Sequence, residues 1–210
     1  MSLIAKEPKG GSGNFKQIPP GAYIARCYWI VDIGTQKTQT KDGVKSERKI
    51  QIGFEVFGDD DSGQPLTVNL NGKEMPLTVK RSLKNSLHEK ANMRKLLASW
   101  RGRDFTPAEL EGFDLINLIN AWAMITITHS ESNGKTYSNI SSISPLPKQL
   151  KDNKPDSVHK NIIFNLSEPD YSVFNGFNEK LQDAIINSPE WAALQFDKQN
   201  KTDMDDAVPF

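Results

Sequence analysis

The stretch RKIQIGFEVF, at residues 48–57, carries the clearest structural pattern in this chain of 210 residues. Apolar and polar side chains alternate along it, with Ile50, Ile52, Phe54 and Val56 in one set and Lys49, Gln51, Gly53 and Glu55 in the other. Successive residues of a β-strand point to opposite faces of a sheet. The alternation therefore predicts a strand with one buried face and one outward face.

Further strands are predicted on both sides of this stretch. AYIARCYWIVDIGTQ, at residues 22–36, is rich in β-branched and aromatic residues, and the turn signal Asp42-Gly43 follows it. After residues 48–57, GDDDSGQP is typical of a loop, and PLTVKRS, at residues 76–82, is typical of a third strand.

The periodicity then changes. In SLKNSLHEKANMRKLLASW, at residues 82–100, apolar residues recur at helical spacing, and Thr106 before Pro107 predicts a second helix start. AWAMITITHS (121–130) and KTYSNISSISPLP (135–147) predict a hairpin around Asn133-Gly134. Five strands with a helix between the third and fourth are the layout of a mainly β fold, the five-stranded OB-fold barrel. An irregular five-stranded sandwich would give a similar pattern.

The other segments are predicted to flank this barrel, which we place at residues 21–147. Residues 1–20 contain GGSG and are expected to form a flexible arm. Residues 148–196 hold signals for a short strand, NIIFNL, and a short helix, NEKLQDAIINS. Because isolated elements this short are marginal in water, we expect this extension to pack on the barrel. Residues 197–210 are expected to form a disordered acidic tail.

Composition excludes several classes of protein. No apolar run approaches the roughly 20 residues that a membrane-spanning helix needs, and residues 1–15 lack the apolar core of a secretory signal. We therefore expect a cytoplasmic protein with no membrane partner. A single cysteine, Cys27, allows no internal disulfide, and the three histidines lack zinc-ligand spacing, so no metal or other cofactor is expected.

Catalytic motifs are absent from the sequence. It has no nucleophile elbow, phosphate-binding Walker loop or HExxH pair. Asp59, Asp60 and Asp61 could be imagined as a metal site of a magnesium-dependent nuclease, but consecutive acids in a loop point in different directions. We favour a binding protein over an enzyme, with that nuclease and a purely protein-binding adaptor as alternatives.

Charge is divided unevenly along the chain. Residues 1–150 carry 20 Lys and Arg against 15 Asp and Glu, whereas residues 151–210 carry 6 against 11. This asymmetry indicates a part that binds a polyanion and an acidic tail, although a solvated basic helix would account equally well for much of residues 80–103. The loops of OB-folds flank a nucleic-acid groove. We expect phosphate contacts from Arg26, Lys37, Lys41, Lys45, Arg48, Lys49, Lys80, Arg81, Lys84 and Lys135.

Aromatic side chains are interleaved with these charges on the predicted strands. Binding of single strands uses flat side chains on which bases stack, each stack contributing about 1–3 kcal/mol. Strand parity places Phe54 in the core and Tyr28, Trp122 and Tyr137 on outward faces, and it leaves Trp29 between the two. The stacking candidates are Tyr28, Trp29, Trp122 and Tyr137.

The final residues, DMDDAVPF at positions 203–210, resemble the acidic tip of bacterial single-stranded DNA-binding proteins, which is a run of acids followed by Ile-Pro-Phe. The first two predicted strands are similar to those of the single-stranded DNA-binding proteins of tailed bacteriophages. Two departures are that Ala207 stands where the bacterial pattern usually has another acid, and that the tail is short.

The resemblance implies a non-catalytic protein that coats single-stranded DNA in replication or recombination, in the cytoplasm of a bacterial host. A phage strand-annealing protein is the alternative within nucleic-acid binding, and homo-oligomer formation stays open. The resemblance also implies that the tip recruits replication and recombination enzymes. Phe210 would then fill an apolar pocket, Val208 and Pro209 would line its approach, and Asp203, Asp205 and Asp206 would meet basic residues of the partner.

Overall fold

Strands dominate the computed structural model, which describes residues 16–40, 43–132 and 134–196. They are β1 (Gly21–Thr40), β2 (Gly43–Phe57), β3 (Thr67–Leu70), β4 (Lys73–Pro76), β5 (Thr78–Lys84), β6 (Trp122–Ser132), β7 (Lys135–Pro145) and β8 (Ile162–Phe164). The helices are α1 (Asn92–Arg101), α2 (Pro107–Glu111), α3 (Tyr171–Asn175) and α4 (Glu179–Ile186), with 3-10 turns η1 (Leu115–Leu118) and η2 (Lys148–Leu150). The expected mainly β character is confirmed. Within the described ranges, no helix is long and apolar enough to cross a membrane.

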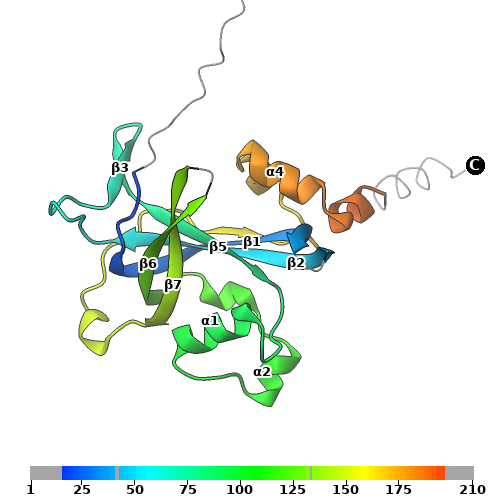
Figure 1. Cartoon of the computed structure of the whole chain (residues 1–210), viewed down its shortest axis with the longest axis horizontal. Coiled ribbons are helices and arrows are strands. Elements are labelled where there is room, and N and C mark those ends of the chain that lie inside the picture. Colours follow the sequence, from blue (N-terminus) through cyan, green and yellow to red (C-terminus); the bar gives the residue numbers. More distant parts are fainter. Residues whose placement is uncertain (1–15, 41–42, 133, 197–210) are drawn as a thin grey trace, which may run out of the picture.

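One six-stranded sheet organises the molecule (Figure 1). Its strands follow the order β5-β2-β1-β6-β7, and β8 pairs with β1 in parallel. The long strand β1 pairs with β2 along one edge, and along the other edge it pairs first with β6 and then, over residues 29–31, with β8. The helices α1 and α2 lie on one side of the sheet in Figure 1, and α4 lies on the other side.

The alternation along β2 is confirmed as the organiser of the main core. Its apolar set is buried together with inward residues of β1, β5, β6 and β7. The buried stripe of α1, which is Met93, Leu96, Leu97 and Trp100, covers the core from one side. Trp100 also donates its Nε1–H to the carbonyl of Trp122 at 3.1 Å, which ties the end of α1 to the start of β6.

The closed barrel expected from the sequence is not observed as a complete ring of strand ladders. The terminal strands of the sheet, β5 and β7, approach each other, and Arg81 on β5 donates to the carbonyl of Ile140 on β7 at 3.0 Å. No backbone ladder joins β5 and β7 among the described residues. α1 packs against both strands at this gap.

The structure contains one hairpin that the sequence did not predict, and one local expectation is wrong. The segment after GDDDSGQP forms a two-stranded hairpin, β3–β4, whose turn is Asn71-Gly72, and both turn residues have positive φ. The predicted helix over residues 82–100 begins only at Asn92. Leu83 is buried on the same face as Val79, so β5 stays extended to Lys84 before the chain turns. The capped helix start at Thr106 and the hairpin across positions 133–134 are confirmed.

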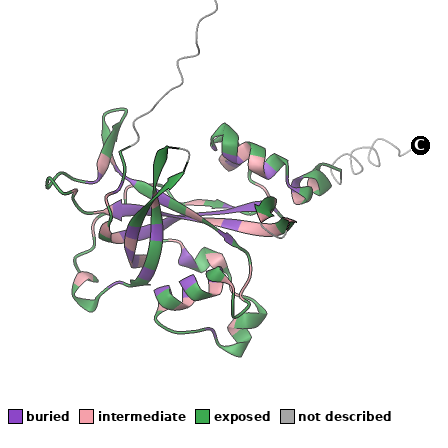
Figure 2. Cartoon of the chain, viewed as in Figure 1, coloured by how far each residue is buried: buried purple, intermediate pink, exposed green. Residues whose placement is uncertain are grey.

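A second hydrophobic core lies on the outward face of β1. The register with β2 shifts between Cys27 and Trp29, so Tyr28 and Trp29 both face this side. β8, α3, α4 and the helical stretch at residues 189–196 cover it, with Phe164, Phe174, Phe177, Ile185 and Trp191 buried there. The buried residues in Figure 2 follow β1 and β2 between α1 and α4.

Candidate nucleic-acid interface

Polar residues lie side by side on the outward faces of β2 and β5, and we call this surface the β2–β5 face. Across the ladder, Lys49 lies opposite Lys84, Gln51 opposite Ser82, and Gly53 opposite Lys80. Like charges placed directly opposite each other on a sheet are destabilising. The Lys49–Lys84 pair therefore marks a position where an anion would relieve repulsion.

Neighbouring groups hold these two lysines in place. Lys49 donates to Thr38 Oγ1 at 2.7 Å, and Lys84 lies 3.1 Å from a carboxylate oxygen of Glu47. The side chains of Lys84 and Glu47 are 55% and 30% exposed, so solvent screens this pair. Exposed pairs of this kind contribute at most about 1 kcal/mol, so a phosphate could replace Glu47 at low cost.

Lys80 lies over the indole of Trp29, with its Nζ 3.3 Å from the ring centroid. Gly53 makes this approach possible, because a Cβ there would lie 2.9 Å from Trp29 Cβ and 3.0 Å from Lys80 Cγ. Burial lowers the pKa of Lys80 to about 8. Lys80 is therefore a cation at neutral pH that loses its charge more easily than an ordinary lysine.

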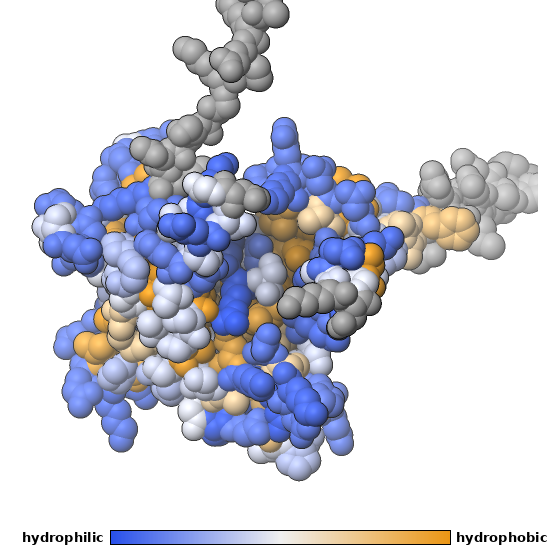
Figure 3. Space-filling model, in the orientation of Figure 1, coloured by the Kyte–Doolittle hydropathy of each residue, from blue (hydrophilic) through white to orange (hydrophobic). Residues whose placement is uncertain are grey.

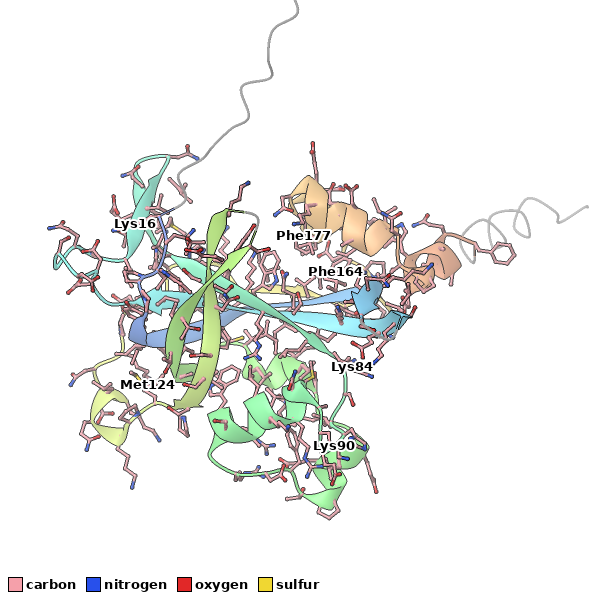
Figure 4. The ribbon with its side chains drawn as sticks, in the orientation of Figure 1. Lys16, Lys84, Lys90, Met124, Phe164 and Phe177 are labelled. Atoms are coloured by element: carbon pink, nitrogen blue, oxygen red, sulfur yellow. The ribbon has the colours of Figure 1, made fainter. Side chains whose placement is uncertain are left out.

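Hollows lie at both ends of β5. The first, about 460 Å³, adjoins its C-terminal end and includes Lys49, Lys84, His88 and Lys90 in its lining. The second, about 330 Å³, adjoins its N-terminal end and includes Lys80 and Tyr137. Figure 3 shows the surface hollowed between the β6–β7 hairpin and α4, and Figure 4 shows Lys84 and Lys90 on the same side of the molecule. Lysines thus follow β5 from one hollow to the other.

Arg26 was expected to contact phosphate, and the structure corrects this. Its guanidinium is buried, pairs with Glu55, and donates to Asn120 Oδ1 at 2.6 Å, Asn161 Oδ1 at 2.7 Å and the carbonyl of His159 at 2.6 Å. All of these partners are within the protein. Arg26 therefore fastens the segment around His159 to the sheet and does not face a ligand.

Two more of the expected arginines are also engaged within the protein. Arg48 pairs with the buried Asp32 at 2.5 Å, and Arg81 bonds to β7 at the gap between the sheet ends. Lys37, Lys45 and Lys135 are exposed, and Lys41 lies outside the described residues. Of the expected phosphate contacts, the β2–β5 face brings together Lys49, Lys80 and Lys84.

Three of the four arginines in the basic run of residues 80–103 are paired with two nearby acids. Arg94 pairs with Asp104 at 2.7 Å, and Arg101 and Arg103 both pair with Glu109. Glu109 also completes the capping box of α2 by accepting from the backbone N–H of Thr106. These three arginines therefore stabilise the α1–α2 connection.

The stacking candidates separate into buried and accessible groups. Tyr28 and Trp29 are 4% and 6% exposed in the second core, and burial raises the pKa of Tyr28 to about 12. These two predictions are wrong for the structure described, because the C-terminal segment covers their outward face. Trp122 is half-buried against Phe57, with ring centroids 5.4 Å apart. Tyr137, at 47% exposed, remains open to a ligand.

The acidic loop at residues 59–61 has a local structural use. Asp60 accepts hydrogen bonds from the Ser62 hydroxyl and from the backbone N–H groups of Ser62 and Gln64, and these bonds lower its pKa to about 2. Among the described residues, no group of three or more His, Cys, Asp or Glu side chains is arranged to hold a metal ion.

Sequence reasoning missed two residues of this surface. Lys90 belongs to the basic run of residues 80–103 but is not among the predicted phosphate contacts, and Gly53 is predicted only as a member of the outward set of residues 48–57. A glycine inside a strand often marks a close approach of neighbouring groups, which was the available signal for Gly53.

The tip residues Asp203, Asp205, Asp206, Val208, Pro209 and Phe210 lie outside the described residues. A scan against protein-family models finds no match for this chain, and a search of curated proteins finds none either.

Proposed function

We propose that this protein binds single-stranded DNA along the β2–β5 face without sequence preference, as an OB-fold protein of phage replication or recombination. The strand order supports the OB-fold assignment. β1, β2 and β5 form a meander, α1 follows β5, and the β6–β7 hairpin returns to pair with β1. OB-folds bind oligonucleotides on the second and third strands, which correspond here to β2 and β5.

The observation that carries the proposal is the lysine series along β5. Lys80 and Lys84 lie on β5, Lys49 lies directly opposite Lys84 on β2, and Lys90 lines the same hollow as Lys49 and Lys84. A phosphate backbone would offset this repulsion and release counterions on binding. The polar Gln51 and Ser82 between the lysines suit sugars and bases of any sequence.

The test is a salt titration of binding to a fluorescently labelled oligo-dT, with duplex DNA of equal length as comparison. For single strands, the logarithm of affinity falls with the logarithm of salt by about 0.7 for each phosphate contact. The variant K49Q/K80Q/K84Q should bind more weakly at 50 mM salt, with a slope shallower by about 2.

The matched control is K148Q/K151Q/K154Q, which removes the same charge from exposed lysines at and after η2. That segment is the yellow loop at the lower left of Figure 1, away from α4. Its slope should equal that of the wild type. Equal losses in the two variants, or equal affinity for duplex and single strands, would contradict binding at the β2–β5 face.

We also propose that residues 203–210 recruit enzymes of replication or recombination, on the basis of the sequence resemblance. Substituting Phe210 with Ala should abolish capture of such partners and leave oligo-dT affinity unchanged. Weaker DNA binding by this variant would instead place Phe210 in the DNA site.

A further inference from the structure

A cavity of about 330 Å³ lies where the N-terminal end of β5 meets the β3–β4 hairpin and β7. Its lining includes Val68, Leu70, Lys80, Tyr137 and His159. Lys16, which also lines it, lies beside the β3–β4 hairpin in Figure 4. This volume is near the lower limit of about 300–1,000 Å³ that is usual for sites of small ligands.

The apolar walls of the cavity are open to solvent. Val68, Leu70 and Tyr137 are 39%, 53% and 47% exposed, and they come from two separate hairpins. Val68 and Leu70 lie on one face of β3, because they are two residues apart. Neither belongs to a hydrophobic core formed by the described residues. Folding therefore does not account for three apolar side chains gathered around this one cavity.

The polar groups around these walls are fixed. His159 Nε2 lies 2.9 Å from the carbonyl oxygen of Pro76, which accepts a hydrogen bond from it. The centroid of the His159 ring lies 4.8 Å from the centroid of the Tyr28 ring. Ser138 donates to Gln17 Oε1 at 3.0 Å. Lys16 pairs with Asp60 at 3.3 Å and donates to the carbonyl of Pro65 at 2.8 Å. Lys80 lines the cavity and also belongs to the β2–β5 face, so it joins the two.

We propose that this cavity holds one unpaired base of the bound strand, stacked on Tyr137 and packed against Val68 and Leu70. The inference rests on the proposed function and adds a base-binding subsite to it. A base has flat apolar faces and polar edges, which match apolar walls with fixed polar groups at the rim. Continuity supports this occupant, because the phosphate beside such a base would lie at Lys80, where the lysine series begins.

The probe is a pair of oligonucleotides with the same number of phosphates. One contains only abasic units, and the other carries a single thymine in the middle of abasic units. Because phosphate contacts are equal, the ratio of the two affinities reports the base alone. The wild type should prefer the one-base strand by about tenfold, within the range for one stacked base.

Two variants remove the subsite, and a third variant serves as the control. V68S/L70S and Y137A should reduce the preference to near one while keeping wild-type affinity for the fully abasic strand, which also shows that they fold. The control L110S/I116S changes two apolar residues of similar exposure, 39% and 47%, at a different cavity, and should keep the tenfold preference.

Photocrosslinking gives an independent readout. A strand with 5-iodouracil as its single base should crosslink to Tyr137 or to residues 67–77, and V68S/L70S should reduce the yield. The subsite is wrong if the wild type binds both strands equally, or if the crosslink maps to another part of the chain. The proposed function fails separately, if neither strand nor oligo-dT binds at low salt.

Discussion

At the scale of single residues, the Arg26–Glu55 pair is a buried ion pair that is held by several further hydrogen bonds. Glu55 is completely buried, and it also accepts from the backbone N–H groups of Val158 and His159, the latter at 2.9 Å. A buried ion pair contributes little compared with apolar residues of the same size, but removing one partner leaves a buried charge without compensation. The pair therefore makes attachment of residues 158–161 depend on both charges.

Substituting Glu55 with Ala should lower the free energy of unfolding by about 3–5 kcal/mol, because Arg26 would remain buried without its carboxylate. Urea denaturation followed by circular dichroism measures this loss. The control is E47A, which breaks the exposed pair with Lys84 and should change stability by at most about 1 kcal/mol. If E55A and E47A lowered the free energy of unfolding by similar amounts, the buried Arg26–Glu55 pair would contribute no more to stability than the exposed pair.

Lys80 gives a prediction about pH. Burial lowers its pKa from 10.5 to about 8, so its charge is lost between pH 7 and pH 9. If Lys80 contacts phosphate, oligo-dT affinity should fall across this range. K80R should flatten the profile, because arginine stays protonated. The effect of the Lys80 charge on folding stability has the opposite dependence on pH to its effect on DNA affinity. The folded pKa lies below the ordinary value, so Lys80 favours folding as pH rises from about 8 towards 10.5.

Fluorescence anisotropy at pH 7, 8 and 9 and constant ionic strength tests the binding prediction. If the wild-type affinity did not change with pH, or if K80R showed a fall of the same size, Lys80 would not contact the DNA phosphates.

At the scale of elements, β1 joins the two cores. Its inward residues belong to the main core, whereas Tyr28, Trp29, Val31 and Ile33 belong to the second core under the C-terminal segment. Close packing at Gly34 fixes that segment on β1. Gly34 has a φ of +69°, and a Cβ there would lie 2.5 Å from Ser188 Cβ and 2.9 Å from Leu166 Cδ2.

Substituting Gly34 with Ala should therefore displace the C-terminal segment from β1. The matched control is G63A, since Gly63 has a similar φ of +75° but an added Cβ would meet no described atom within 4 Å. Both variants should lose about 1–2 kcal/mol of folding stability, because an alanine is strained in the left-handed conformation. G34A should lose more, and limited proteolysis should cut residues 165–190 faster. Equal losses and equal cleavage would mean that Gly34 does not hold the segment.

Local patterns predicted the elements that depend on neighbouring residues. The alternation of β2 and the Asn-Gly signal at positions 133–134 are of this kind, and the same signal at Asn71-Gly72 could have revealed the β3–β4 hairpin. The outward direction of Tyr28 was predicted correctly from parity. Its burial was not, because the segment that covers it lies more than 130 residues away in sequence.

Candidate site residues were harder to predict for the same reason. Sequence shows that an arginine is charged, but not that Glu55 will meet Arg26 across the β1–β2 ladder. It also could not show that Glu109 would take two arginines of the basic run. Lys49 and Lys80 were predictable because strand parity directs both outward. Lys84 was expected in the helix over residues 82–100 and was named only for its charge, since the extension of β5 to Lys84 was not predicted.

At the scale of the whole molecule, charge separates the surface proposed for DNA from the C-terminal part of the chain. Residues 1–150 have a net charge of +5 and residues 151–210 a net charge of −5. Three of the acids are Asp203, Asp205 and Asp206, close together in sequence. If this acidic cluster competes with DNA for the lysines of the β2–β5 face, neutralising it should strengthen DNA binding.

The variant D203N/D205N/D206N should bind oligo-dT severalfold more tightly at 50 mM salt. The gain should shrink as the Debye length falls from about 10 Å at 0.1 M to about 3 Å at 1 M salt. D152N/D156N/E168Q changes the net charge equally at exposed positions outside the cluster. If only the overall field of the protein matters, both triple variants gain equally. If the cluster competes for the lysines, only the first gains, and combining it with K49Q/K80Q/K84Q removes the gain.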